Sequence, residues 1–374
     1  MYFLIDEVSM FSDYIFDSID RCMQRLMNNT TKFGGKRIVL AGDFGQVLHI
    51  IQTFSTSQIL NSTILNSKYW HSIKKLHLHK NMRVLQNNTN ANVEWANWLL
   101  KVRDGTASKY MLPNIDEHHQ HAISIPNNIV APFDMDDMIE FVYPHINAPY
   151  HYINNPIFQK AGIVAPTLKT TAEINQKALE KYVGREILLT SDDNIHNDDV
   201  NRERYSNEFL WSLDFKGFPS HIIKLKKGSP VMLIRTVDKS RNFNNGTKLT
   251  VETTRKYLLT LRRAAPPFDL LHLPRWRMET SAAQLGFTLT RKQFPIMPAF
   301  CTTINKIQGH TMNKIGIYLD RAIFAHGQLY VALSRAIGPH AVLLMIQETQ
   351  TQGKNSNNDN YHTLNIVHRE LFQY

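Results

Sequence analysis

The chain has 374 residues, enough for two or three domains, and its formal net charge of +10 suits a polyanionic partner, although a merely soluble basic protein is the alternative. Its only cysteines, Cys22 and Cys301, exclude a disulfide framework and a cysteine-rich zinc site and fit a reducing, intracellular compartment. No apolar run has the length of a membrane span, and Asp6 and Glu7 fall where a signal peptide would need its apolar core.

The chain opens with an apolar run, Met1 to Ile5, that stops at two adjacent acids, Asp6 and Glu7. Such a run predicts a fully buried parallel strand, and open α/β sheets bind ligands at the carboxyl ends of their strands. Asp6 could hold a hydrated Mg²⁺ against nucleotide phosphates, and Glu7 could orient and polarise an attacking water. The pattern is typical of a Walker B strand; the alternative is that the acidic pair only ends a strand or caps the next helix.

A second apolar run, Arg37-Ile-Val-Leu-Ala, is followed by Asp43 and Gln46. It predicts another buried strand, after which the amide of Gln46 could sense a terminal phosphate. Residues 11–28 carry apolar side chains close to helical spacing, so strand, helix and strand form a predicted βαβ unit. No segment fits the phosphate-binding pattern G-x-x-x-x-G-K-[ST] that should precede such a strand. The chain is therefore expected to begin in the middle of a nucleotide site.

The next segments alternate between predicted elements and loops. Residues 55–70 and 93–102 are predicted helices, and Ile73 to Arg83 is a predicted strand. Arg83 at its end could reach a neighbouring phosphate as a transition-state finger, with a surface arginine as the alternative. Residues 109–155 are rich in Pro, Asn, Asp and His, which predicts a linker. The cluster Asp116 to His121 lacks ordered spacing, so we interpret it as a solvated loop rather than a metal site.

A second α/β domain is predicted to begin with a buried strand from Lys160 to Thr167 and a helix from Thr170 to Tyr182. Residues 192–204 are charged and Asn-rich, which predicts an exposed loop. From residue 221 to about 260, short β segments and the hairpin signal Asn245-Gly246 predict a small antiparallel barrel inserted in this domain. Its lysines and arginines could line a nucleic-acid surface, although a solvated barrel face is nearly as compatible.

The carboxyl-terminal part returns to strands and polar turns. Phe294 to Thr311 predicts a strand followed by hydroxyls, an amide, a lysine and a glycine, which are groups that grip phosphates. Ile315 to Leu319 is the next predicted strand. Residues 327–335 form a predicted helix near whose end Arg335 is a candidate second finger, and residues 341–346 form a final strand.

In this order the segments resemble superfamily-one B DNA helicases of the petite-integration-frequency type, close to RecD and especially to the helicase portion of Helitron transposons. Six stretches match successive features of that family: Leu4-Ile-Asp-Glu-Val-Ser-Met10 (motif II), Gly42-Asp-Phe-Gly-Gln46 (motif III), Asn81-Met-Arg83 (motif IV), Ile163-Val-Ala-Pro-Thr167 (the strand opening the second RecA-like domain), Thr303 to Thr311 (motif V) and Tyr330-Val-Ala-Leu-Ser-Arg335 (motif VI).

The resemblance implies an α/β fold with two RecA-like parallel-sheet domains, the first truncated, and a small SH3-like β-barrel inserted in the second. The boundaries it implies are 1–108 for the truncated first domain, 109–155 for the linker, 156–220 with 292–374 for the second domain, and 221–291 for the inserted subdomain. After Gln46 the family usually continues Leu-Pro-Pro-Val, whereas this chain has Val47-Leu48-His49-Ile50, so the geometry of that loop is expected to differ.

The same resemblance implies roles for individual residues. Asp6 would bind Mg²⁺ with Glu7 nearby, Glu7 would activate the water, and Gln46 would couple the phosphate state to DNA. Arg83 and Arg335 would neutralise the transition state. ATP would be contacted by Asp6, Gln46 and Gly309. The DNA backbone would be held by Thr167, Thr303, Asn305, Lys306 and Gln308.

The function implied is that of a Mg²⁺-dependent ATPase that moves 5′ to 3′ on single-stranded DNA and unwinds forked or structured duplexes, in repair, recombination and telomere maintenance. A nuclear or also mitochondrial location is expected, with no membrane association and no obligate protein partner evident. Without the Walker A loop, this polypeptide is expected to be an amino-terminally truncated form with impaired activity. One alternative is a non-catalytic single-stranded-DNA-binding remnant of a transposon helicase; another is a P-loop ATPase without nucleic-acid work.

Overall fold

The computed structural model describes residues 2–49, 54–78, 80–82, 89–109, 122–131, 134–148, 157–196, 205–215, 217–263, 267–280, 287–354 and 360–372. The chain divides into two compact units. Unit 1 comprises Met1–Phe133, Ile307–Thr311 and Ile317–Tyr374, and unit 2 comprises Asp134–Lys306 and Met312–Gly316. Unit 1 thus holds residues 317–374, which the sequence assigns to the second domain; the predicted domain boundaries stay a prediction.

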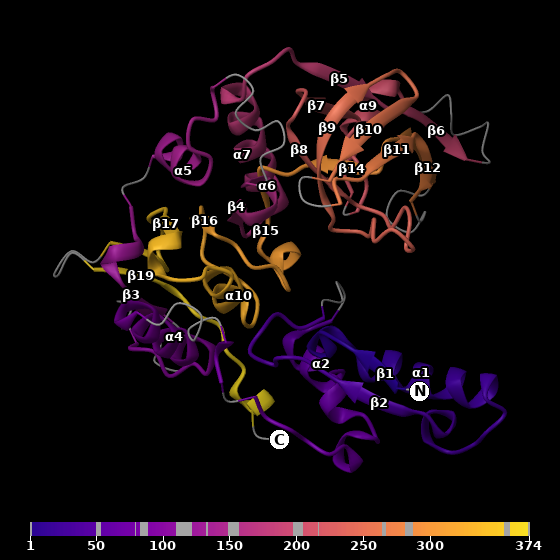
Figure 1. Cartoon of the computed structure of the whole chain (residues 1–374), viewed down its shortest axis with the longest axis vertical. Helices are drawn as coiled ribbons and strands as arrows, with labels where there is room; N and C mark the ends of the chain where they lie inside the picture. The colour runs from indigo at the N-terminus through magenta and orange to yellow at the C-terminus, as the bar shows by residue number, and fades with distance from the viewer. Residues whose placement is uncertain are drawn as a thin grey trace. The chain divides into compact units, whose positions relative to one another are not determined.

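Unit 1 begins with the predicted βαβ arrangement. Strand β1 (Tyr2–Ile5) pairs in parallel with β2 (Arg37–Leu40), and helix α1 (Asp13–Leu26) connects them (Figure 1). The hydroxyl of Ser12 accepts a hydrogen bond from the Ile15 amide at 3.4 Å, so Ser12 is the N-cap of α1. The core below this sheet is built from apolar side chains that include Val8, Phe16, Phe33, Ile64 and Trp70.

The prediction that β1 is fully buried is wrong. Leu4 is 71% exposed, and Val39, its partner in the register with β2, is 49% exposed. Side chains alternate between the two faces of a strand, and in this two-stranded sheet only the face bearing Ile5 and Ile38 packs on the core. An apolar run does not reveal whether one face or both are covered.

The remainder of unit 1 is mainly helical, with a small antiparallel sheet in the order β18-β19-β3. Helix α10 packs on α4. The bounds of these elements are α2 (Thr56–Asn61), α4 (Asn90–Arg103), β3 (Ala122–Ile125), α10 (Gln328–Ser334), β17 (Val342–Ile346), β18 (Gly353–Lys354) and β19 (Tyr361–Leu364). Strand β16 (Lys314–Leu319) contributes residues to both units.

Two predictions in this unit need correction. Residues 55–70 are not one helix, because α2 ends at Asn61 and is followed by two short 3₁₀ turns, Ile64–Asn66 and Trp70–Ser72. The predicted strand from residue 73 is not formed by the described residues 73–78 and 80–82. Leu78 is fully exposed there, so the alternating apolar residues that favoured a strand have no buried face to occupy.

Unit 2 contains the second parallel pair. Strand β4 (Ala161–Ala165) is buried along its whole length and pairs in parallel with β15 (Cys301–Thr303), as the apolar runs predict. Helix α7 (Leu168–Lys181) follows β4 and is joined to β15 by Asn175, whose amide donates to the carbonyl of Cys301 and accepts from its N–H. Two further helices are α5 (Met135–Val142) and α6 (Ile157–Lys160).

The antiparallel part of unit 2 includes a five-stranded sheet in the order β11-β10-β9-β8-β14. Its strands, visible together in Figure 1, are β8 (Pro230–Leu233), β9 (Lys248–Thr254), β10 (Leu258–Arg262), β11 (Leu270–Pro274) and β14 (Ile296–Pro298). Strand β5 (Ile187–Thr190) pairs with β7 (Ile222–Leu225), and their side chains join the same apolar core. The predicted antiparallel strands are therefore present, while SH3-like barrel closure stays a prediction.

The exposed loop predicted at residues 192–204 is wrong for residues 192–196, which form β6 in a three-stranded sheet, β12-β13-β6; residues 197–204 lie outside the described residues. The sheet comprises β6 (Asp192–His196), β12 (Trp276–Glu279) and β13 (Thr288–Gln293), with helix α9 (Asn207–Ser212) against β6. Arg291 on β13 and Asp193 on β6 form an ion pair at 2.7 Å with side chains 0% and 1% exposed. The guanidinium also donates to the carbonyls of Leu210, Leu213 and Pro219. The charge of Asp193 is therefore buried and paired with Arg291, whereas the charged composition of this segment suggested exposure to solvent.

The exposed β1–β2 face leads to a first prediction. Replacing Leu4 and Val39 together with Thr should reduce self-association, because an exposed apolar sheet face favours association between copies. The melting temperature should change little, since surface substitutions usually alter stability by less than about 0.5 kcal/mol. Sedimentation velocity over a concentration series measures the first effect. An unchanged distribution of sedimentation coefficients in the double variant would contradict the prediction.

The buried ion pair leads to a second prediction. Arg291→Leu should lower the free energy of unfolding by about 3–5 kcal/mol, because Asp193 is left as an uncompensated buried charge. Adding Asp193→Leu should recover a large part of that loss. Denaturant unfolding of both single variants and the double variant measures this. Equal destabilisation by Arg291→Leu with and without Asp193→Leu would show that the charge pairing is not the cause.

Candidate functional site

The two acids that follow β1 lie in a strained turn. Glu7 has φ 53° and ψ 41°, in the left-handed region that non-glycine residues seldom adopt. Its N–H donates to Oδ1 of Asp6 at 2.9 Å. The following residue, Val8, donates its N–H to the carbonyl of Ala41 at 3.0 Å. The turn after β1 is therefore tied to the end of β2, and strain of this kind is typical of functional sites.

The carboxylate of Glu7 is held from a distant part of the chain. Nε2 of Gln308 donates to Oε2 of Glu7 at 2.9 Å. The next residue, Gly309, has φ +80°, and a Cβ there would lie 3.6 Å from Oε1 of Glu7. Gln308 and Gly309 belong to the Ile307–Thr311 segment, which we call the motif V turn. A backbone with positive φ explains why glycine stands beside this carboxylate.

Arg335 binds the same turn. Its side chain is nearly completely buried, and its guanidinium donates to the carbonyl of His310 at 3.3 Å, to Oγ of Ser334 at 2.8 Å and to the carbonyl of Val331 at 3.1 Å. Glu7 and Arg335, which the sequence predicts to face one nucleotide, therefore contact residues two positions apart in the motif V turn. The arrangement brings an acid and a guanidinium close to one backbone segment.

The motif III loop is organised by Asp43. This carboxylate accepts hydrogen bonds from the Gly45 amide at 3.0 Å, from Nε of Arg103 at 2.8 Å and from the Gln46 amide group at 3.4 Å. Burial, with the nearby Asp43 carboxylate, raises the pKa of Tyr330 to about 12. Oε1 of Gln46 and Oε1 of Gln308 are both buried without a hydrogen-bond partner among the described residues. Each can accept a hydrogen bond from a water molecule or ligand.

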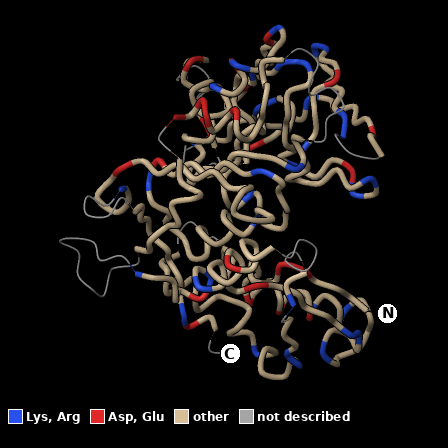
Figure 2. Tube along the Cα trace, turned by 60° about the vertical axis from the view of Figure 1, so that its left-hand side comes forward, with Lys and Arg blue, Asp and Glu red and all other residues tan. Residues whose placement is uncertain are grey.

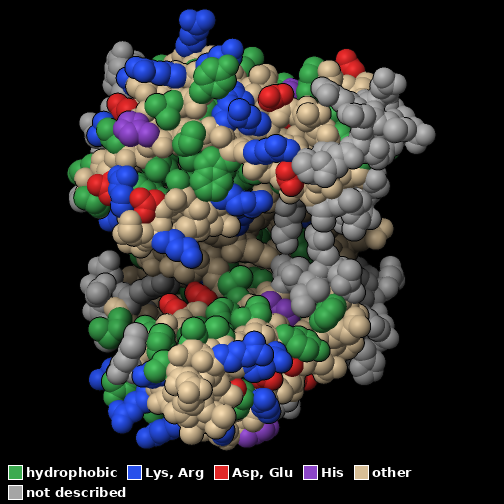
Figure 3. Space-filling view, turned by 90° about the vertical axis from the view of Figure 1, so that its right-hand side faces the viewer, with side chains coloured by type: hydrophobic (Ala, Val, Ile, Leu, Met, Phe, Trp, Pro, Cys, Tyr) green, Lys and Arg blue, Asp and Glu red, His purple; other side chains and the backbone are tan. Residues whose placement is uncertain are grey.

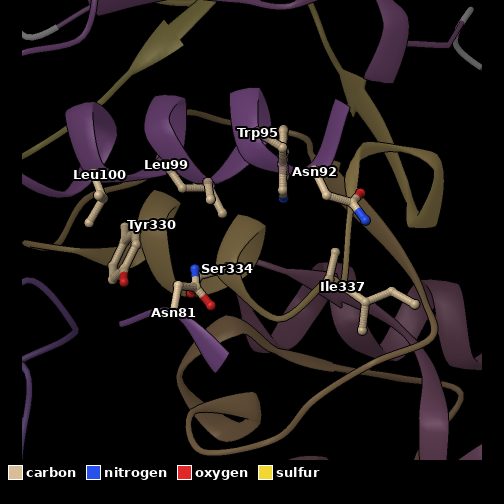
Figure 4. Close-up of a pocket in the computed structure, with 10 residues that line it drawn as sticks. Asn81, Asn92, Trp95, Leu99, Leu100, Tyr330, Ser334 and Ile337 are labelled. Carbon is tan, nitrogen blue, oxygen red and sulfur yellow. The ribbon is translucent and has the colours of Figure 1, made fainter. Parts of the chain in front are cut away.

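The elements that carry Arg103 and Tyr330 enclose a cavity of about 80 Å³. Figure 4 shows Tyr330 and Ser334 on α10 and the side chains of Leu99 and Leu100 on α4 around it. Trp95 on α4 is 6% exposed, and its ring is stacked on that of Trp98 with 5.1 Å between the ring centroids. Because α4 packs on α10, Arg103 at the end of α4 lies within hydrogen-bonding distance of Asp43.

Several residues predicted to bind DNA gather in unit 2. Thr303 ends β15 and Thr167 follows β4, so both lie at the carboxyl edge of this parallel pair. Thr167 caps α7 by accepting from the Thr170 amide at 3.2 Å. Asn305 and Lys306 lie in the 3₁₀ turn Ile304–Ile307 directly after Thr303. Carboxyl edges of parallel strands are common ligand sites, and the DNA roles stay a prediction.

Basic side chains are spread over several elements. Figure 2 shows Lys and Arg interspersed with Asp and Glu along much of the trace, and on the face in Figure 3 they stand among apolar and other polar side chains. The excess charge thus offers a diffuse attraction for phosphates on the face shown. None of the described helices combines the length and apolar character that a membrane span requires.

Two of the predicted site features, Arg83 as the first finger and the cluster Asp116 to His121, lie outside the described residues. Within the described part of the chain, no group of three or more His, Cys, Asp or Glu side chains is placed to hold a metal ion. Asp6 is exposed at the end of its strand. One carboxylate completed by phosphates and waters is a usual Mg²⁺ environment, so Asp6 fits a metal that arrives with a nucleotide.

Sequence reasoning missed four residues that organise the motif III loop: Asp43 as an anchor, Arg103, Tyr330 and His326. Nε2 of His326 lies 2.7 Å from the carbonyl of Phe44. Burial lowers the pKa of His326 to about 4, with His368 lowering it further and Asp43 and Glu370 opposing. The only signal in the sequence is a histidine directly before the Gly-Gln pair that opens the predicted helix.

Comparison with known proteins identifies related sequences. Residues 1–111 match a family described as PIF1-like helicase, and residues 208–253 match the 2B domain of the DNA helicase Pif1. The ATP-dependent DNA helicase PIF1 of Homo sapiens is 25% identical over 340 residues, 89% of this chain and 44% of that protein. The Campylobacter jejuni protein of the same name is 24% identical over 355 residues, 91% of this chain and 68% of that protein. The chain spans about half the length of the animal relatives it matches.

Solved structures share the fold. The Pif1 helicase from Candida albicans aligns with a TM-score of 0.61 and 19% identity, covering 100% of this chain and 75% of that one. Pif1 helicase from Bacteroides in complex with ADP-AlF3 and ssDNA aligns with a TM-score of 0.61 and 20% identity, covering 93% and 71%. The predicted α/β fold with parallel sheets is confirmed by these similarities and by the β1–β2 and β4–β15 pairs.

The depressed pKa of His326 gives a prediction for pH dependence. Its folded-state pKa is about 4 against 6.5 in a free histidine, so the neutral form is favoured in the folded chain. This contribution is fully present above pH 6.5 and is lost as pH falls towards 4. Between pH 7 and 4 the wild-type chain should lose about 3 kcal/mol more stability than His326→Phe, at 1.36 kcal/mol per unit. Urea unfolding across that range measures the difference, and parallel curves would refute it.

Proposed function

We propose that this chain, whose residues 1–111 match the PIF1-like helicase family, is part of an ATP-dependent DNA helicase that moves 5′ to 3′ along single-stranded DNA and unwinds forked or structured duplexes. The observation that carries this proposal is the shared attachment of Glu7 and Arg335 to the motif V turn, at 2.9 Å to Gln308 and 3.3 Å to His310. A nuclear location and a part in repair, recombination and telomere maintenance are proposed from similarity to that family alone.

In this proposal the side chains of unit 1 handle ATP hydrolysis. Mg²⁺, when bound with ATP at Asp6, would neutralise phosphate charge. Glu7, held through Oε2 by Gln308, can accept a proton from the attacking water at Oε1. The Oε1 atoms of Gln46 and Gln308, which have no hydrogen-bond partner within the described part of the chain, can orient that water. Arg335, with Arg83 as the other proposed finger, can stabilise negative charge that develops in the transition state.

The motif V segment offers a route between DNA and nucleotide. Thr303, Asn305 and Lys306, the proposed DNA contacts, precede Gln308 by only a few residues in the sequence. If DNA binding displaces the 3₁₀ turn Ile304–Ile307, the backbone would carry that movement to Gln308, the next residue. Gln308 would in turn shift the carboxylate of Glu7, to which it donates a hydrogen bond. DNA binding and ATP hydrolysis would then be coupled through one short segment of the chain, and the rate of hydrolysis would depend on DNA.

A second candidate is favoured by one specific observation. The 374-residue sequence contains no segment that matches the phosphate-binding pattern G-x-x-x-x-G-K-[ST]. The backbone and lysine of that pattern supply much of the affinity for nucleoside triphosphates. By itself this polypeptide could act as a non-catalytic protein that binds single-stranded DNA. The two candidates share DNA binding and differ in ATP turnover.

We predict that this polypeptide alone binds single-stranded DNA in a salt-sensitive manner but binds ATP weakly and hydrolyses it negligibly. Fluorescence anisotropy with a labelled oligo(dT) should show affinity falling about tenfold or more between 50 and 200 mM salt, because phosphate contacts release counterions. Lys306→Gln should weaken binding severalfold. The exposed Lys101 provides the matched charge-loss control, and Lys101→Gln should have little effect.

An ATPase assay with and without the oligonucleotide completes the test. Robust DNA-stimulated turnover would contradict the expected low activity and support the enzyme over the non-catalytic candidate. Absence of any salt-sensitive affinity for single-stranded DNA would contradict both candidates and would favour an ATPase without nucleic-acid work.

A further inference from the structure

His326 stands at the meeting point of three segments of unit 1. It lies two residues before the start of α10, from which Gly327 separates it, and the residue is 5% exposed. Nε2 lies 2.7 Å from the carbonyl oxygen of Phe44 in the motif III loop, and Nδ1 lies 2.9 Å from the backbone nitrogen of His368 near the end of the chain. One imidazole therefore bridges two segments that are far apart in the sequence.

These two contacts fix the protonation of the ring. The Phe44 carbonyl can only accept, so Nε2 must carry a proton, and the His368 N–H can only donate, so Nδ1 must be unprotonated. A proton on Nδ1 would point at the His368 N–H and break that bond. The ring of His368 is stacked on His326 at 5.3 Å with an interplanar angle of 18°, which holds the imidazole plane in place.

Other contacts surround the bridge. Gly327, with φ +67°, leaves no room for a side chain, since a Cβ would collide with the Gly45 carbonyl and lie 2.7 Å from the carbonyl carbon of Gln46. The carboxyl-terminal segment also binds α4, where the Asn365 amide donates to the carbonyl of Val102 at 2.8 Å. Arg103, which pairs with Asp43, lies over the ring of Phe372 at 5.3 Å.

We propose that His326 is a positioning residue whose Nε2–H tautomer fastens the motif III loop to α10 and to the carboxyl-terminal segment, residues 365–372. Gln46 is two residues from Phe44, so the position of its amide depends on this bridge. Release of the carboxyl-terminal segment would make the motif III loop more mobile. The segment therefore determines how well the side-chain amide of Gln46 is held in position. The importance of Gln46 rests on the proposed function, whereas the bridge itself does not.

Two variants separate the halves of the bridge. In His326→Gln the side-chain amide can still donate to the Phe44 carbonyl, the role of Nε2. In His326→Asn the side-chain oxygen can still accept from the His368 N–H, the role of Nδ1. His326→Phe keeps a ring for stacking and loses both hydrogen bonds. His71→Gln, at an exposed histidine of unit 1, is the matched control.

Hydrogen–deuterium exchange of the full chain, without ATP or DNA, provides the readout. In His326→Phe, peptides covering residues 42–46 and 365–372 should both exchange at least fivefold faster than in the wild type. His326→Gln should keep residues 42–46 slow and release residues 365–372, and His326→Asn should do the reverse. His71→Gln should match the wild type.

A role in packing alone predicts a different pattern, because both polar variants would then loosen both segments equally and His326→Phe would be the mildest. That pattern would overturn the proposal. So would a long-range ¹H–¹⁵N spectrum of the wild-type chain that shows His326 as the Nδ1–H tautomer or as imidazolium at pH 7. Neither measurement involves nucleotide or DNA, so failure here is distinguishable from failure of the helicase proposal.

Discussion

The hydrogen bond from Gln308 to Glu7 is the constraint on which the candidate site depends. It joins two residues 301 positions apart in the sequence and holds a carboxylate whose own backbone is in a strained, left-handed conformation. Because Arg335 binds the same turn through the His310 carbonyl, motifs II, V and VI form one local arrangement. A strained acid needs such outside support, since a free turn after β1 would relax to a commoner conformation.

The motif III loop adds a second layer of support. Asp43 accepts hydrogen bonds from its own loop and from Arg103 on α4, while His326, two residues before α10, binds the same loop. The loop thus receives hydrogen bonds from two other segments of the chain as well as from its own backbone, and each donor meets an acceptor. Networks of this kind tolerate the loss of single contacts poorly, because every buried donor or acceptor left behind carries a desolvation cost.

Local patterns predict the strands and helices with the clearest periodicity, while β3, β6, β11 to β13, β18, β19 and α5 are not predicted. The apolar runs at β2, β4 and β16 and the capped helix α1 are found where periodicity places them. The patterns do not show which faces and segments will be covered. Leu4 is exposed because only one face of β1–β2 packs on the core, and residues 192–196 form a strand because they pair with β13, where Asp193 contacts Arg291 98 residues away. The motifs predict Glu7, Gln46 and Arg335 as site residues, and their roles stay a prediction. Arg103 and His326 escape notice because their partners, 60 and 282 residues distant, are set by the tertiary fold.

A double-mutant cycle on Glu7 and Gln308 tests the central claim most directly. Glu7→Leu, Gln308→Leu and the double variant are unfolded in urea, and the coupling energy is obtained from the three differences from wild type. A charge-assisted hydrogen bond between the two side chains predicts a coupling of about 1 kcal/mol or more. Additivity within about 0.3 kcal/mol would mean that the residues do not interact, and it would contradict a site assembled on the motif V turn.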